Sequence, residues 1–311
     1  MINFRPHLKS FEEYLQLHYR AKATIKGNLW HLDKFIEYLQ RYGLDDIRQI
    51  TSRHITEYRK FRYFRINDRG ETDSPASQNR HLEALKRFFA FLKQEGVIIH
   101  DPTEKSEYAR VPKRLPKSAL SDQEINKLLA CPDTNTLMGY RDRTMMEVLY
   151  SSGIRQGELI NLNLTDVDLE DGFLRINEGK GGHDRMVPLG RIARQFLENY
   201  IKGIRPSFHN ARKREALFLS KKGNRISKTA LVERIEKYVK ASGIEKHVTT
   251  HTFRRTCATG MIKNDCNAYL VKELLGHSDM RTIEVYCDLT IVELKKAHKK
   301  HHPRERQKAA F

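Results

Sequence analysis

A proline-containing segment, residues 101–119, divides this 311-residue sequence into two parts. Its sequence, DPTEKSEYARVPKRLPKSA, has three prolines and little apolar periodicity, which is typical of a linker. The regions on either side have amphipathic patterns of their own, and the total length suits two domains better than one. We therefore expect one domain over residues 1–103, a linker over 104–119, a second domain over 120–290 and a tail over 291–311.

The region before the linker has the periodicity of helices. Near the N-terminus, Ser10 and Glu13 have the spacing of a capping box, which predicts that a helix begins there. Two apolar stripes at helical spacing follow, each ending near a glycine, and they consist of Leu29, Leu32, Phe35, Ile36 and Leu39 before Gly43, and of Leu82, Leu85, Phe88, Phe89 and Leu92 before Gly96. These patterns predict a small all-helical domain.

The region after the linker predicts a mainly helical domain with a small β-sheet. Ser121 and Glu124 again have capping-box spacing, and the run YRDRTMMEVLYSSG predicts a buried helix that stops at Gly153. Another helix is expected to start near Arg155. The segment FLRINEGKGGHDRMVPL alternates on both sides of its glycines and predicts a β-hairpin. Further helices are expected at about 191–203, 227–242 and 252–264.

The chain is strongly basic, with a net charge of +18 and a pI of about 9.7. The excess is present in both halves, which favours a polyanionic partner, DNA or RNA ahead of a membrane surface. Solubility alone is the alternative explanation. No apolar run has the roughly 18 residues of a membrane-spanning helix, and the first residues lack the apolar core of a signal peptide. The four cysteines have no metal-ligand spacing, which favours free thiols in a reducing cytoplasm.

Several polar residues of the second domain have spacings that bring them together. Arg155 and Glu158 are three residues apart, so a carboxylate can hold a guanidinium on one helix face, although such a pair alone is more often a surface ion pair. Lys180 lies among three glycines in EGKGGHDR, which suits a close backbone approach to a ligand, with a solvated turn lysine as the alternative. His251 and Arg254 in THTFRRT again have a three-residue spacing.

A histidine and a tyrosine follow in the stretch LLGHSDMRTIEVYCDLT. His277 precedes a predicted helix, and Tyr286 lies nine residues after it. Taken alone, Tyr286 can be a half-buried aromatic residue. Together with the arginines, the lysine and the histidines, it completes a set of groups that can bind a phosphate and attack it.

These motifs resemble the tyrosine recombinases of the phage-integrase and Xer type. GIRQGELINL, GKGGHDRMVPL, HTFRRTCATGMI and LLGHSDMRTIEVY occur in the order of that family across residues 121–290. The resemblance implies an N-terminal all-helical SAM-like core-DNA-binding domain and an α+β catalytic domain. Arg255, Ile283 and Cys287-Asp288 depart from the frequent residues of the family, which puts the choice of target in doubt but removes no catalytic group.

The resemblance implies that Arg155 and Arg254 bind the non-bridging oxygens of the scissile phosphate. The guanidinium fork matches phosphate geometry and remains charged, so it can stabilise a pentacoordinate transition state. Glu158 would support Arg155 from behind, and His277 would donate a hydrogen bond to a phosphate oxygen.

The same resemblance implies that Tyr286 attacks phosphorus and forms a 3′-phosphotyrosine. His251 would accept or share the phenolic proton, and Lys180 would protonate the leaving 5′-oxygen. Because the covalent bond keeps the energy of the broken phosphodiester, neither ATP nor a metal is required, and no cofactor is expected.

The expected activity is site-specific DNA recombination through a Holliday junction. Two alternatives stay open: a DNA-binding protein without activity on the same scaffold, and relaxation of DNA by a type IB topoisomerase. The resemblance implies a double-stranded DNA partner with an inverted-repeat core site, bound by a monomer or dimer per site and by a homotetramer on paired sites. The expected location is the cytoplasm, at the nucleoid, with no membrane partner.

Two further expectations concern DNA contacts and assembly. Asn79, Arg80 and Lys86 are candidate groove contacts by position only, and an exposed basic helix face explains them as simply. Thr290 and Glu293 have capping-box spacing, which predicts a helix from about residue 291. The resemblance suggests that this helix docks on a neighbouring protomer, and docking on its own domain is the alternative.

Overall fold

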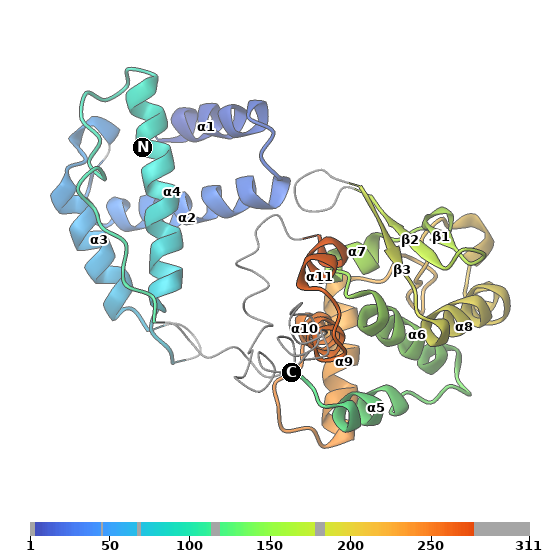
Figure 1. Cartoon of the computed structure of the whole chain (residues 1–311). Helices are drawn as coiled ribbons and strands as arrows, with labels where there is room; N and C mark the ends of the chain where they lie inside the picture. Colours follow the sequence, from blue (N-terminus) through green and yellow to red (C-terminus); the bar gives the residue numbers. More distant parts are fainter. Residues whose placement is uncertain (1–3, 45, 67–69, 113–118, 178–183, 277–311) are drawn as a thin grey trace, which may run out of the picture. The chain divides into compact units, whose positions relative to one another are not determined.

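A computed structural model of the chain describes residues 4–44, 46–66, 70–112, 119–177 and 184–276. The chain divides into two compact units, Met1–Arg114 and Leu115–Phe311, so the division falls within the predicted linker (Figure 1). The predicted fold class is confirmed, because the units are mainly helical and the second also contains a small sheet. No helix in the described part of the chain is both long and apolar enough to cross a membrane.

In the described part of the first unit, the regular elements are helices, apart from one isolated bridge. Its helices are α1 (Arg5–Leu17), α2 (Lys22–Gln40), α3 (Ser52–Phe64) and α4 (Pro75–Gln94). Helix α4 packs against the other three (Figure 1). The two apolar stripes of the sequence form the buried faces of α2 and α4, where Phe35, Phe88 and Phe89 are each 1% exposed. Both predicted stripes are therefore confirmed as core.

Helix α1 begins earlier than its predicted capping box. The helix starts at Arg5, and Pro6 occupies its first turn, where a missing backbone N–H removes no helical hydrogen bond. Ser10 lies inside the helix and donates its hydroxyl to the carbonyl of Pro6 at 3.2 Å. The prediction of a start at Ser10 was wrong, because proline supplied the start signal four residues earlier.

Part of the predicted linker belongs to the first unit. Asn79 of α4 donates its amide to the carbonyl of Ala109 at 2.9 Å and accepts from the backbone N–H of Ala109 at 2.7 Å. Lys86 lies over the ring of Tyr108, 5.3 Å from the ring centroid. These contacts attach residues 108 and 109 to helix α4.

The buried helix α6 (Leu137–Ser152) lies at the centre of the second unit. Around it are α5 (Asp122–Ala130), α7 (Gln156–Asn161), α8 (Arg191–Asn199), α9 (Lys228–Ser242), α10 (Thr250–Lys263) and α11 (Ala268–Leu275). The capping box at the start of α5 is confirmed: Ser121 accepts from the N–H of Glu124, and Glu124 accepts from the N–H of Ser121. Helix α8 ends before the predicted residue 203 and continues as a wider turn, Tyr200–Ile204.

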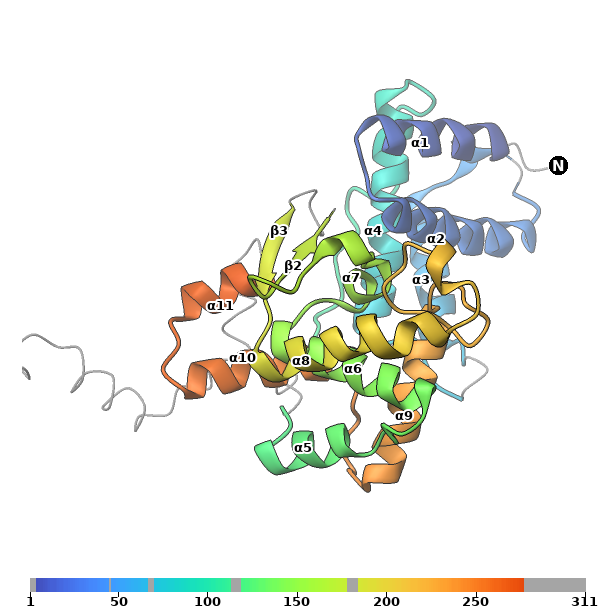
Figure 2. The same cartoon turned by 90° about the vertical axis from the view of Figure 1, so that its right-hand side faces the viewer.

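The predicted hairpin is confirmed as two strands of a three-stranded antiparallel sheet. Strands β2 (Phe173–Ile176) and β3 (Arg185–Pro188) pair with Leu174 opposite Val187, and a short strand, β1 (Val167–Asp168), adds to β2. Leu174 and Val187 are fully buried and anchor the sheet on the core. Figures 1 and 2 both show β3 beside α11.

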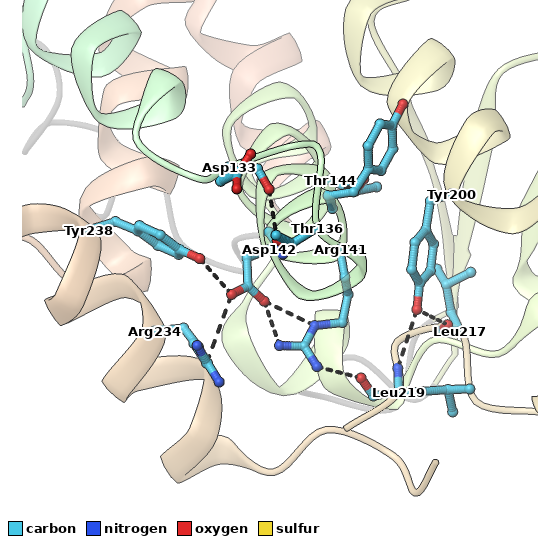
Figure 3. Close-up of polar contacts among 12 residues, drawn as sticks. Asp133, Thr136, Arg141, Asp142, Thr144, Tyr200, Leu217, Leu219, Arg234 and Tyr238 are labelled. Atoms are coloured by element: carbon cyan, nitrogen blue, oxygen red, sulfur yellow. Dashed lines mark hydrogen bonds and ion pairs between the residues drawn. The ribbon is translucent and has the colours of Figure 1, made fainter. Parts of the chain in front are cut away.

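A buried ion pair links α6 to the segments that cover it (Figure 3). The Arg141 side chain is 2% exposed and that of Asp142 is 1% exposed, and the guanidinium donates to the carboxylate and to the carbonyl of Leu219. Asp142 also accepts from the hydroxyl of Tyr238 in α9 at 2.8 Å. A buried ion pair is tolerated when hydrogen bonds satisfy its remaining atoms, so this network fixes α9 and the Leu219 segment against α6.

The chain turns sharply where α6 ends and the approach to α7 begins. Gly153 stops α6 in the left-handed conformation, with φ of 61°. A Cβ at this position would lie 2.8 Å from Cδ2 of Leu275, so the end of α11 approaches the backbone there. The stop at Gly153 was correctly predicted, and it places Arg155 beside the end of α11.

We expect Gly153→Ala to lower the free energy of unfolding more than Gly243→Ala. Both glycines have positive φ, 61° and 64°, which costs another residue about 1–2 kcal/mol. The added methyl meets Leu275 at position 153, whereas the nearest atom at position 243 is the Lys127 Nζ at 3.8 Å. Gly260→Ala, inside α10 with nothing within 4 Å, is the neutral or stabilising control. Urea unfolding followed by circular dichroism compares the variants, and equal losses at 153 and 243 would contradict the close approach.

Candidate active site at the end of α11

Arg155 is held at the start of α7 by Glu158. The guanidinium Nη1 lies 2.7 Å from Oε1 of Glu158, and the backbone N–H of Arg155 donates to Oε2 at 2.7 Å. Arg155 is the residue before the helix, so the carboxylate fixes both the helix start and the direction of the side chain. The predicted pairing of Arg155 with Glu158 is present in the structure.

Arg254 reaches the same region from α10. The residue is 3% exposed, and its guanidinium donates to the carbonyl of Gly153 at 2.7 Å and to that of Leu275 at 2.6 Å. A buried cation without acceptors would cost several kcal/mol. The glycine stop of α6 and the end of α11 supply acceptors for it.

Three arginines bind three consecutive carbonyls at the end of α11. Arg185 Nε donates to Leu274 at 3.4 Å, Arg254 to Leu275 at 2.6 Å and Arg155 Nη2 to Gly276 at 2.8 Å. The last carbonyls of a helix lack partners within the helix and carry partial negative charge, so cations are favourable there. Gly276, with φ of 62°, closes the helix. The residue that follows it is His277.

Glu158 is shared between two arginines. Besides Arg155, Arg185 donates Nη1 to Oε1 at 3.0 Å and Nη2 to Oε2 at 2.9 Å. Burial acts to raise the pKa of the Glu158 carboxyl, but hydrogen bonds from Arg185 and Arg155 outweigh it and lower this pKa to about 2. The carboxylate therefore stabilises the fold fully above its usual pKa of 4.5, and that contribution is lost as the pH falls toward 2.

His251 lies in the first turn of α10 and is exposed to solvent. Partial desolvation and the nearby cations, Arg254 and Arg155 first among them, lower the pKa of His251 below 6.5. A neutral imidazole has an unprotonated ring nitrogen, so it can act as a general base during a reaction.

The structure brings four of the predicted site residues together, namely Arg155, Glu158, His251 and Arg254. Lys180, His277 and Tyr286 lie outside the described residues, as does the predicted helix after residue 290. Lys180 falls in the segment between β2 and β3, and His277 directly follows Gly276.

The three candidate DNA contacts of the first unit lie on α4 with different surroundings. Arg80 is exposed, Lys86 lies over Tyr108, and the side chain of Asn79 bonds the backbone of Ala109 at both of its polar atoms. The amide of Asn79 thus has a structural partner. DNA contacts by these residues stay predictions.

Sequence reasoning missed Arg185, which touches Glu158, Leu274 and the space beside Gly276. The sequence contained a signal for this position, because every second residue of a strand faces the same side. The side that carries Arg185 also carries Val187 and Leu189, and both of these are buried. An arginine on the apolar face of a strand requires a partner.

Comparison with known proteins agrees with this geometry. The model of the phage integrase family matches residues 118–291, and that of the phage integrase N-terminal SAM-like domain matches residues 8–96. Tyrosine recombinase XerC 2 of Ralstonia nicotianae is 33% identical over 96% of this chain and 85% of its own length. Tyrosine recombinase XerD of Listeria monocytogenes is 35% identical over 90% of this chain and 93% of its own.

A solved structure shares the fold. The crystal structure of a lambda integrase dimer bound to a COC′ core site has a TM-score of 0.69 and 22% identity, covering 91% of this chain and 95% of that one. The family matches show that the chain belongs to the phage integrase family. It is a tyrosine recombinase, an enzyme that cuts and rejoins DNA in site-specific recombination. The inactive-scaffold and topoisomerase alternatives are not favoured.

In the DNA-free protein, the pKa of His251 is expected below 6.5, so that the ring is neutral at pH 7 and gains its proton only at lower pH. Arg155→Met should raise this pKa, because a nearby positive charge is removed. Histidine C2–H signals followed by NMR from pH 5 to 8 measure it, with His251→Gln identifying the signal. A midpoint at or above 6.5, or one that Arg155→Met does not move, would contradict the arrangement.

Proposed function

We propose that this recombinase binds the scissile phosphate with Arg155 and Arg254, and that Tyr286 attacks it. One observation carries the proposal: the guanidinium groups of these arginines, from different elements, donate to the adjacent carbonyls of Leu275 and Gly276, at 2.6 and 2.8 Å. His277 is covalently attached to Gly276, and Tyr286 belongs to the segment that follows. The segment that follows these two arginine-bound carbonyls in the sequence therefore contains both His277 and Tyr286.

The arginines supply positive charge fixed before the substrate arrives. Glu158 and the carbonyls hold the guanidinium groups, so little reorganisation is needed when charge develops on the phosphoryl oxygens. The side chain of Arg155 is 22% exposed, which leaves a surface for the phosphate. His277 donates a further hydrogen bond to a phosphate oxygen.

The reaction is balanced by two proton transfers. The phenolic oxygen of Tyr286 bonds to phosphorus as the bond to the 5′-oxygen breaks. An ordinary phenol has a pKa of about 10, so it is mostly protonated at neutral pH. The nearby cations favour the phenolate form, and His251 accepts the phenolic proton. Lys180 gives a proton to the departing 5′-oxygen. A 5′-hydroxyl of the partner strand later attacks the 3′-phosphotyrosine and restores a phosphodiester, so the cycle consumes no nucleotide.

The partner is double-stranded DNA with an inverted-repeat core site. One chain occupies each arm, and a reaction between two duplexes through a Holliday junction then needs four chains, with the segment after residue 290 docked on the neighbour. Mass photometry of paired sites counts the chains. The basic charge of both halves supports this partner.

The proposed location of the protein is the cytoplasmic nucleoid. Fluorescence microscopy tests this location by comparing a fluorescent fusion of the protein with stained DNA.

Tyr286→Phe should abolish the covalent DNA adduct while DNA binding stays within about twofold, because only the hydroxyl is lost. The substrate is a nicked duplex that carries the core site selected by the chain from a random-sequence library. SDS gels measure the adduct, and gel shifts measure binding. Tyr269→Phe is the matched control, since Tyr269 is an exposed tyrosine of α11 and should keep the wild-type adduct. An adduct in Tyr286→Phe would place the nucleophile elsewhere.

Lys180→Ala should slow cleavage of normal DNA by about a hundredfold or more, in the range of general acid catalysis. A 5′-bridging phosphorothioate leaves without protonation, so the same variant should cut it at nearly the wild-type rate. Lys222→Ala removes an exposed lysine from a turn and serves as the control. Single-turnover rates measure both substrates. Equal impairment on the sulfur substrate would exclude Lys180 as the general acid.

A further inference from the structure

Arg185 joins three parts of the catalytic unit. It is the first residue of β3, its side chain is 14% exposed, and its guanidinium lies 2.9 and 3.0 Å from the two oxygens of Glu158. Its Nε donates to the carbonyl of Leu274 at 3.4 Å. A Cβ built on Gly276 would lie 3.0 Å from its Cζ, so the guanidinium also packs against the last turn of α11.

The net charge of the cluster formed by Arg155, Glu158 and Arg185 depends on Arg185. Arg155 and Glu158 alone form a neutral pair, because a carboxylate that accepts hydrogen bonds from the guanidinium and the backbone N–H of Arg155 stays ionised at neutral pH. Adding Arg185 gives a cluster of two guanidinium groups and one carboxylate, with one net positive charge. A neutral pair attracts a phosphate less strongly than a cation, above all where burial reduces solvent screening.

We infer that Arg185 is a positioning residue for the recombination reaction: it offsets the charge of Glu158, so that Arg155 keeps a net positive field for the scissile phosphate. It also keeps the carboxylate turned toward Arg155, because Oε1 accepts from both guanidinium groups, and Oε2 accepts from Nη2 of Arg185 and from the backbone N–H of Arg155. Arg185 acts through Glu158 and does not need to touch the DNA. This inference rests on the proposed role of Arg155.

A simple cross-link between β3, α7 and α11 is the other explanation for the same contacts. The two explanations differ in what happens when Glu158 is also neutralised. If charge is what matters, Glu158→Gln returns one net positive charge to an Arg185→Met protein. If packing is what matters, the second substitution removes one more contact and makes the defect larger.

The test compares Arg185→Met, Glu158→Gln, the double variant and Arg185→Lys on the nicked core-site duplex. Arg185→Met should lower the single-turnover cleavage rate about tenfold or more, with binding by gel shift within about twofold. The double variant should recover most of the lost rate, and Arg185→Lys should fall between Arg185→Met and wild type. Arg175→Met is the matched control, because Arg175 lies on the paired strand, its side chain is 61% exposed, and it forms an ion pair with the exposed Asp184 at 3.5 Å.

A second measurement does not depend on catalysis. The pKa of the Glu158 carboxyl, followed by ¹³C NMR in the DNA-free protein, should rise in Arg185→Met, because hydrogen bonds to the charged form are lost. An unchanged Glu158 titration, wild-type cleavage by Arg185→Met, or a double variant slower than Arg185→Met would each overturn the inference. Absence of an adduct in the wild-type protein would instead overturn the proposed function, and the NMR titration would still test the pairing.

Discussion

The binding of guanidinium groups to the last carbonyls of α11 holds the candidate active site together. Helix ends leave carbonyl groups without partners and with partial negative charge. Residues 274, 275 and 276 supply three such carbonyls, and Arg185, Arg254 and Arg155 bind them in that order. Strand β3 and helices α10 and α7 therefore meet at one point. The close approach of α11 to Gly153 depends on the absence of a side chain there.

The same unit uses arginine–carbonyl contacts elsewhere for the fold alone. Arg205 is 5% exposed and donates to the carbonyls of Ala211, Arg214, Ala216 and Leu217. These hydrogen bonds hold the segment of residues 211–217 against Arg205. Arg141 does the same for Leu219. At the end of α11, Arg155 reaches the surface and shares an ionised carboxylate with Arg185, so the cluster has a net charge that can act on a ligand.

Patterns among neighbouring residues predicted those structural features that depend on interactions within a short stretch of sequence. The stop at Gly153, the capping box at Ser121, the hairpin and the Arg155–Glu158 pair depend on neighbours a few residues apart. The sequence patterns did not predict contacts between segments that are far apart in the chain. The bonds from Asn79 to Ala109 join residues thirty positions apart, and those from Arg254 to Gly153 join residues about a hundred apart. Arg185 was missed because a single charge in a strand pattern does not name its partner. The start of α1 was misplaced because Pro6 competes with Ser10 as a start signal.

In the proposed mechanism, the segment that follows the arginine-bound end of α11 carries the nucleophile. Mass spectrometry of the wild-type DNA adduct tests it most directly. The adduct is trapped on the nicked core-site duplex and digested with nuclease and trypsin, which releases the peptide of residues 282–295. We expect a nucleotide remnant on Tyr286 in this peptide. A remnant on any other residue, such as the exposed Tyr269 of α11, would contradict it.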